Sequence, residues 1–357
     1  MDNNGKINGM SYKEIVENQI AQWITCVRFT DFYEEIEKRI IGQPNLKLVI
    51  ADIYSYLSGI VFGNPANCNM ILSAPSGTGK TETYRAIREY FLKEIPSLPI
   101  YIFDITAVTS NGFKGLDAAN ILTPLFSLHI NRPYGIVFLD EFDKRMVPLT
   151  DARGENMNRD VQSSLLTIVE GNEVQVRGGM IDTSNLMFVG LGSFDSFREE
   201  KKDVRRPVGI GMDWSYVEDT RDHYKALTRE DMVSAGASNE LIGRFPYIVN
   251  YERLSDAAIT SIIDKTTQEV AEEYNLTELI LGKAMYDVLY ECANTKFGCR
   301  LIASKLKEAT LTGYADAMEK APDFYNTTND YGLVITIESP EDIKAEWEIL
   351  DDNPLCS

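Results

Sequence analysis

A short apolar run that leads directly into a glycine-rich turn constrains this chain more than any other feature. The run is Asn69–Ala74 (NMILSA), the turn reads PSGTG, and a stretch with helical periodicity follows from Lys80. Gly77 and Gly79 let the backbone turn tightly, so that successive N–H groups face one anion. A helix that starts here presents its positive amino-terminal end to the same anion. This is the Walker A pattern, with alanine in place of the commoner first glycine, and it predicts a phosphate-binding loop.

The residues of this loop have separate expected roles. Lys80 supplies a point charge for the β- and γ-phosphates of a nucleotide, and the Thr81 hydroxyl supplies a ligand for Mg²⁺. We therefore predict ATP and Mg²⁺ as cofactors. The residues of this segment predicted to bind them are Pro75, Ser76, Gly77, Thr78, Gly79, Lys80, Thr81 and Glu82.

Two adjacent acids follow a second apolar run. Asp140 and Glu141 come directly after Gly135–Leu139 (GIVFL), sixty residues beyond Lys80. Asp140 is expected to hold Mg²⁺, directly or through water, and Glu141 to polarise the water that attacks the γ-phosphate. Two acids at the end of a strand are otherwise ordinary solvated loop residues. The strand context and the spacing from Lys80 favour the catalytic interpretation.

The remaining apolar runs indicate the fold class. Five short runs alternate with stretches of 3.6-residue periodicity, which argues for an α/β fold with a parallel sheet covered on both faces. The expected strands are 69–74, 100–105, 135–139, 185–189 and 247–251. Beyond Leu254 the expected elements are helices at 255–275, 277–294 and 297–320 and a strand at 332–337.

Four regions follow from this pattern. They are a helical amino-terminal extension over residues 1–34, a large αβα nucleotide-binding domain over 35–248, a smaller mainly helical domain over 249–337, and an acidic tail over 338–357. The tail holds seven acids and one lysine, and on composition we expect a solvated or partly disordered end.

Charge and cysteine usage exclude several classes. The 357 residues include 35 Lys and Arg against 54 Asp and Glu, a net charge of −19 that disfavours nucleic acid and membrane surfaces as partners. No run is long enough to span a membrane, and the polar start lacks a signal-peptide pattern. Five cysteines without a CxxC pair and only two histidines indicate reduced thiols in a cytoplasmic protein, and argue against zinc, haem or histidine-based hydrolase sites.

Several segments in order resemble the AAA+ ATPases, and within them the protein-unfoldase branch that includes ClpX and HslU. The likeness covers about residues 33–337. The segments that carry it are IIGQ at 40–43, DEFDK at 140–144, the helix DVQSSLLTIVEG at 160–171, DTSN at 182–185 with GSF at 192–194, LIGRFP at 241–246 and GCR at 298–300.

The resemblance implies a P-loop AAA+ αβα domain followed by a smaller helical lid domain, with further site residues. Ile40 and Ile41 would contact adenine. Arg244 would reach across a subunit boundary to the neighbour's γ-phosphate, and Arg300 would act on its own subunit's nucleotide. For either arginine alone, a surface ion pair is the plainer interpretation. At the sensor-1 strand end, only Ser193 offers a small polar group.

The resemblance also implies a ring and a substrate. Gly112, Phe113, Lys114 and Gly115 stand where the branch places an aromatic pore loop, and six copies in a homo-hexamer would grip a polypeptide. The alternative is a glycine-rich turn whose phenylalanine packs into the core. The zinc-binding amino-terminal domain of ClpX and the inserted domain of HslU have no counterpart in the sequence.

Ile210-Gly211-Met212 occupies the place of the ClpX loop that docks on a peptidase. Peptidase docking is one interpretation, and a structural turn or docking on another partner are the others. We expect an ATP-dependent unfoldase and translocase that hydrolyses ATP to thread polypeptides. The alternative is a remodeller that disassembles one protein complex without proteolysis. A nucleic-acid motor of related fold is disfavoured by the acidic charge.

Overall fold

The computed structural model describes residues 6–7, 10–63, 68–109, 116–126, 128, 130–150, 154, 156–198, 223–295, 297–321 and 330–350. The chain divides into two compact units. The first comprises Met1–Pro75 and Gly79–Arg253, and the second comprises Leu254–Ser357 with Ser76–Thr78. None of the described helices is long and apolar enough to cross a membrane.

The first unit is built on a five-stranded sheet in the order β4-β5-β8-β3-β9, and every neighbouring pair is parallel. The expected fold class is confirmed. All five expected strands are present, as β3 (Met70–Ser73), β4 (Ile100–Asp104), β5 (Gly135–Asp140), β8 (Leu186–Gly192) and β9 (Tyr247–Asn250).

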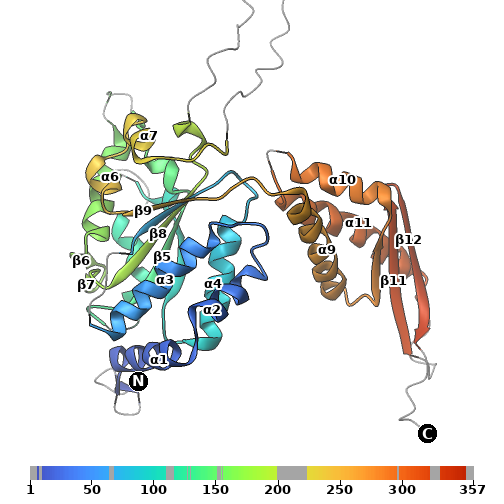
Figure 1. Ribbon diagram of the computed structural model, residues 1–357, viewed down its shortest axis with the longest axis horizontal. Helices are drawn as coiled ribbons and strands as arrows, with labels where there is room; N and C mark the ends of the chain where they lie inside the picture. Colours follow the sequence, from blue (N-terminus) through green and yellow to red (C-terminus); the bar gives the residue numbers. More distant parts are fainter. Residues whose placement is uncertain are drawn as a thin grey trace, which may run out of the picture. The chain divides into compact units, whose positions relative to one another are not determined.

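Helices cover both faces of this sheet (Figure 1). On one face lie α1 (Tyr12–Cys26), α2 (Phe29–Glu37), α3 (Leu46–Val61) and α4 (Lys80–Glu94), and on the other lie α6 (Met157–Val169), α7 (Arg229–Ser234) and α8 (Asn239–Ile242). Successive strand residues point to opposite faces. Met70 and Leu72 therefore join the α1–α4 core, whereas Ile71 joins the core beneath α6.

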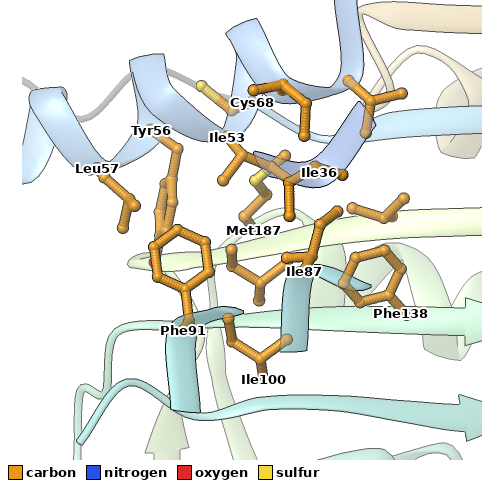
Figure 2. Close-up of a cluster of buried hydrophobic side chains, with 14 of the residues drawn as sticks. Ile36, Ile53, Tyr56, Leu57, Cys68, Ile87, Phe91, Ile100, Phe138 and Met187 are labelled. Atoms are coloured by element: carbon orange, nitrogen blue, oxygen red, sulfur yellow. The ribbon is translucent and has the colours of Figure 1, made fainter. Parts of the chain in front are cut away.

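Helices α1 and α2 share the core of the first unit. Ser11 caps α1 with a reciprocal Ser11–Glu14 capping box, and Ile20 and Trp23 are buried. The Trp23 ring lies 5.2 Å from both the Phe32 and Phe91 rings. Figure 2 shows part of the same core, where Ile53, Tyr56 and Leu57 of α3 face Ile87 and Phe91 of α4. Helices α1 and α2 thus pack as part of the first unit.

A short antiparallel hairpin joins α6 to β8. Its strands are β6 (Glu173–Val176) and β7 (Gly179–Asp182). The smaller elements of the described first unit are β1 (Lys6–Ile7), β2 (Met10–Ser11), α5 (Thr123–Phe126) and short 3₁₀ turns at Ile105–Ala107, Ala118–Leu122, Phe142–Arg145 and Asp195–Phe197.

The second unit packs three helices on one face of a three-stranded sheet. The helices are α9 (Asp256–Glu273), α10 (Lys283–Ala293) and α11 (Arg300–Glu319), and the strands β10 (Glu278–Leu281), β11 (Asp330–Ser339) and β12 (Asp342–Leu350) run in the order β10-β11-β12. Ser255 caps α9 as expected.

Two expectations for this unit are wrong. The helix expected over 277–294 begins only at Lys283, because Glu278–Leu281 pairs in parallel with β11. The expected solvated end is in fact strand β12 over Asp342–Leu350, which pairs with β11 along its length. Its Trp347 donates to the Ala317 carbonyl of α11 at 3.0 Å, so the strand is fixed to the helices by a side-chain hydrogen bond as well.

The burial of α1 predicts its contribution to stability. Ile20→Ala should lower the free energy of unfolding by about 2–5 kcal/mol, since it removes buried methyl groups from a packed core. Gln22→Ala, on the exposed face of the same helix, should change it by less than about 0.5 kcal/mol. Urea denaturation followed by circular dichroism measures both. Equal small effects would show that α1 is not part of the core.

Candidate functional site

The phosphate loop connects the carboxyl end of β3 to the start of α4. Gly77 and Gly79 have φ angles of 77° and 102°, conformations that side chains with a Cβ rarely adopt. The Ala74 N–H donates to the Gly192 carbonyl at 3.2 Å, and the Thr83 N–H and hydroxyl both donate to the Gly79 carbonyl. The start and the end of the loop are therefore fixed by hydrogen bonds to β8 and α4.

Lys80 is bonded to the loop that it follows. Its Nζ donates to the carbonyls of Ala74 at 2.5 Å and Pro75 at 2.8 Å. Burial lowers the pKa of Lys80 to about 8, and the nearby carboxylates, Asp143 foremost, act in the opposite direction. The Lys80 ammonium group is therefore held by neutral carbonyl oxygens in a desolvated place. A phosphate anion bound there would stabilise its charge.

The two predicted acids stand at the end of β5, beside the loop. Asp140 is the last residue of β5 and accepts from the Glu141 N–H at 3.0 Å. Glu141 itself has a φ of 54°, the left-handed region that a glutamate seldom occupies. Such strain accumulates at functional sites. Burial, followed by the charges of Asp143 and Asp140, raises the pKa of Glu141, which makes it a better proton acceptor.

Asp143 is a site residue to which the sequence analysis gave no separate role. It is 2% exposed, and its Oδ2 accepts from the Ser193 hydroxyl at 3.3 Å and the Phe194 N–H at 3.2 Å. A Cβ at Gly192 would lie 2.7 Å from Asp143 Oδ1, so glycine is needed there for the carboxylate to fit. The Ser193 hydroxyl is thus bonded to Asp143 at the end of β8, where the resemblance predicts sensor 1.

The segment expected to contact adenine lies against the loop. The Ile40 side chain is buried and is the nearest neighbour of Gly79 on the side where a Cβ would stand, at 3.9 Å. Gln43 fixes the segment by exchanging two hydrogen bonds with the backbone of Glu252. Glu82, one of the predicted binding residues, is ion-paired with Arg39 and Arg85, so its carboxylate fastens this segment to α4.

The donor set at the loop fits Mg²⁺. Thr81 and Asp140 offer a hydroxyl and a carboxylate oxygen, and magnesium at nucleotide sites is bound by few protein oxygens together with the phosphates. Within the described ranges, no group of three or more His, Cys, Asp or Glu side chains is arranged to hold a metal ion without the phosphates.

Arg244 lies far from its own phosphate loop. Its guanidinium is ion-paired with Glu170 at the end of α6, and its carbonyl accepts from the Asn69 side chain at 3.2 Å. Asn69 precedes β3, whereas Lys80 follows the other end of that strand. The structure therefore does not bring Arg244 and Lys80 of one chain together.

The remaining predicted residues belong to other segments of the chain. Arg300 is exposed and begins α11 in the second unit. The pore-loop residues 112–115 and the segment 205–212 with Ile210-Gly211-Met212 lie outside the described residues.

The AAA domain model of the Cdc48 subfamily matches residues 66–248, which hold the loop, the acid pair and Arg244. The chain belongs to the AAA domain family. With the site described above, the AAA domain makes it an ATPase.

Among curated relatives, the ATP-dependent Clp protease ATP-binding subunit ClpX of Treponema denticola is 27% identical, covering 81% of this chain and 76% of its own. The protein of the same name from Borrelia duttonii is 28% identical, covering 76% of this chain and 70% of its own. The ClpX 3 protein of Methylococcus capsulatus is 31% identical over 58% of this chain and 52% of its own. The resemblance inferred from the motifs to a ClpX-like AAA ATPase is confirmed.

The backbone of the loop yields a matched pair of variants. Gly79→Ala should weaken ADP binding at least about tenfold, because φ at 102° is strained for alanine and the loop must shift. Gly63→Ala, at a φ of 71° with open space around it, should cost similar stability and leave ADP affinity unchanged. Titration with a fluorescent ADP analogue and thermal melts measure both. Equal ADP affinities in the two variants would contradict the assigned loop.

Proposed function

We propose that this ATPase is the subunit of a homo-hexameric ring that uses Mg·ATP hydrolysis to unfold proteins and thread them through its pore. The observation that carries the proposal is the division of the site between two edges of one sheet. Lys80, Asp140 and Glu141 stand at the carboxyl edge, whereas Arg244 stands at the amino edge of β3.

In this proposal each residue of the carboxyl edge has one task. Lys80 and the loop N–H groups hold the β- and γ-phosphates, and Thr81 and Asp140 hold Mg²⁺. The Glu141 carboxylate accepts the proton of the water whose oxygen attacks the γ-phosphorus, while ADP leaves with the electron pair of the broken bond. The raised pKa of Glu141 supports its assignment as the proton acceptor.

The place of Arg244 supports action on a neighbouring subunit. Asn69 to Ala74 are five steps of extended chain, about 16 Å at the usual strand rise, so Arg244 is separated from its own loop by the length of β3. Arg244 is about half exposed, and its partner Glu170 holds it at the surface. An arginine held in this way is accessible to the γ-phosphate of an adjacent chain.

The substrate and the peptidase partner rest on the relatives and the sequence. Relatives at 27% and 28% identity are named as ATP-binding subunits of an ATP-dependent Clp protease. Phe113 between flanking glycines is the proposed grip on the polypeptide, and Ile210-Gly211-Met212 the proposed contact with a peptidase. The names of these relatives favour unfolding over dedicated complex disassembly.

Mixed rings test the trans action of Arg244. Glu141→Gln and Arg244→Ala should each lose nearly all ATPase activity while they retain nucleotide binding. In a mixed ring, an R244A chain still supplies Glu141 to its own site, and an E141Q neighbour still supplies Arg244 to that site. Random assembly places such a pair at about a quarter of the sites. ATPase activity should therefore reappear on mixing.

The matched control is a mixture of Glu141→Gln with Arg300→Ala. Arg300 is proposed to serve its own subunit, so no site of that mixture has both groups and activity should stay absent. Recovery in the control mixture, or none in the first, would contradict the assignment of Arg244 to the neighbouring site.

The grip on polypeptide is tested separately at Phe113. Phe113→Ala should keep basal ATPase activity and lose unfolding of a tagged fluorescent protein, because the ring supplies the apolar contact to the threaded chain. Phe113→Tyr, which keeps the ring, should retain unfolding. Unfolding by F113A at the normal rate would exclude threading through this loop.

A further inference from the structure

A buried arginine outside the recognised motifs lies at the edge of the nucleotide site. Arg198 follows the short turn Asp195–Phe197 after β8, and it is 5% exposed. Its side chain reaches back toward the carboxyl edge of the sheet, where β3 enters the phosphate loop. It is therefore placed between the elements on which the ATPase site depends.

The guanidinium connects three segments that are far apart in the chain. Nη2 donates to the Ser73 hydroxyl at 3.0 Å, Nη1 to the Ser193 carbonyl at 2.5 Å, and Nε to the Lys225 carbonyl at 2.9 Å. Ser73 is the last residue of β3, and Ser193 directly follows β8. The planar guanidinium presents its donors in a fixed geometry, so these bonds set the distance between the two strand ends.

Both strand ends lead to groups of the site. Ser73 precedes Ala74, whose carbonyl accepts from Lys80 Nζ. Ser193 donates its hydroxyl to Asp143, which follows the catalytic pair by two residues. Arg198 is thus joined by two short paths to the cation of the phosphate loop and to the acidic turn that carries Glu141.

Stability alone gives a poor account of this residue. Burying a guanidinium costs free energy that an ion pair only partly returns. The Asp195 carboxylate, 3.7 Å from Arg198 Nη1, also bonds His223. Three of its donors are spent on neutral oxygens. The strand ends at this edge carry the groups that react with ATP. The contribution of Arg198 is therefore to fix the distance between these strand ends.

We propose that Arg198 is a positioning residue for ATP hydrolysis, which holds the ends of β3 and β8 so that Lys80 and Glu141 act on the same phosphate. It acts through Ser73 and Ser193 and has no contact with the nucleotide in this role. The proposal rests on the ATPase activity and does not depend on trans action or threading.

The test compares Arg198→Ala, Arg198→Lys and Ser73→Ala by steady-state ATPase assays on the full chain. R198A should lower kcat at least tenfold and change KM for ATP less than threefold, because nucleotide binding persists while the alignment is lost. R198K, which restores one of the contacts, should give an intermediate kcat. S73A should lower kcat by a smaller factor, and the double variant R198A/S73A should be no slower than R198A.

The matched control is Tyr56→Phe. The Tyr56 hydroxyl also joins two strands of this sheet, accepting from the Gly135 N–H at 3.0 Å and bonding the Asn185 carbonyl at 2.7 Å, but at the amino edge. Y56F should lower Tm by several degrees and leave kcat per folded chain within twofold. ADP affinity and the mass of the assembly are recorded on the same samples. They distinguish a variant that fails to assemble from one in which Lys80 and Glu141 are misaligned.

Three results would overturn the proposal. One is an R198A variant that behaves as Y56F does, with a lower Tm and an unchanged kcat. Another is a raised KM with unchanged kcat, which would assign Arg198 to nucleotide binding. The third is a double variant R198A/S73A whose fold-loss of kcat equals the product of the losses in S73A and in R198A. If R198A does not fold, R198K and S73A decide alone, and an unchanged kcat in both overturns it.

Discussion

The parallel pairing of β3 with β8, and of β8 with β5, is the constraint on which the rest of the site depends. Parallel strands end at the same edge of a sheet, so the register that opposes Ser73 to Gly192 also brings the phosphate loop level with the acids at the end of β5. Both faces of these strands are buried, and alternate residues pack into the two helix-covered cores, which fixes the sheet between them. Lys80 and Glu141 therefore lie near the same edge of the sheet because the core packs in this way.

In the proposed function, the same geometry leaves each site incomplete within one chain. Arg244 follows α8 and lies at the amino edge, where Asn69 and Glu170 hold its backbone and its side chain. A rigid sheet cannot bring its two edges together. A charge at the amino edge can serve the γ-phosphate only in an assembly of chains, and this is the structural reason for proposing a ring.

The sequence was sufficient for the parts of the molecule with strong local signals. The five sheet strands are continuous apolar runs, and the phosphate loop and the cap at Ser255 are short local patterns. Where two local signals conflict, the sequence alone does not decide between them. In β12 the apolar residues Ile343, Ala345 and Trp347 alternate with charged ones, and the charge of this segment predicts a solvated end where the structure has a strand.

Other features had no local signal that a single sequence could reveal. β10 became a strand only because β11, some fifty residues later, offers a parallel edge. Arg198 stands in a polar stretch that reads as surface, and its burial depends on Ser73, 125 residues away. Asp143 was visible within DEFDK, but its bond to Ser193 requires the packed sheet. Long-range contacts of this kind are fixed by the fold and leave no periodic pattern behind.

The central claim is that one chain holds only part of an ATPase site. The ATPase rate per chain, measured across a dilution series beside the mass of the assembly, tests it most directly. The account predicts a rate per chain that is near zero for isolated chains and rises as rings form, with no such rise in Arg244→Ala. Isolated chains that hydrolyse ATP at the rate of assembled ones would contradict it.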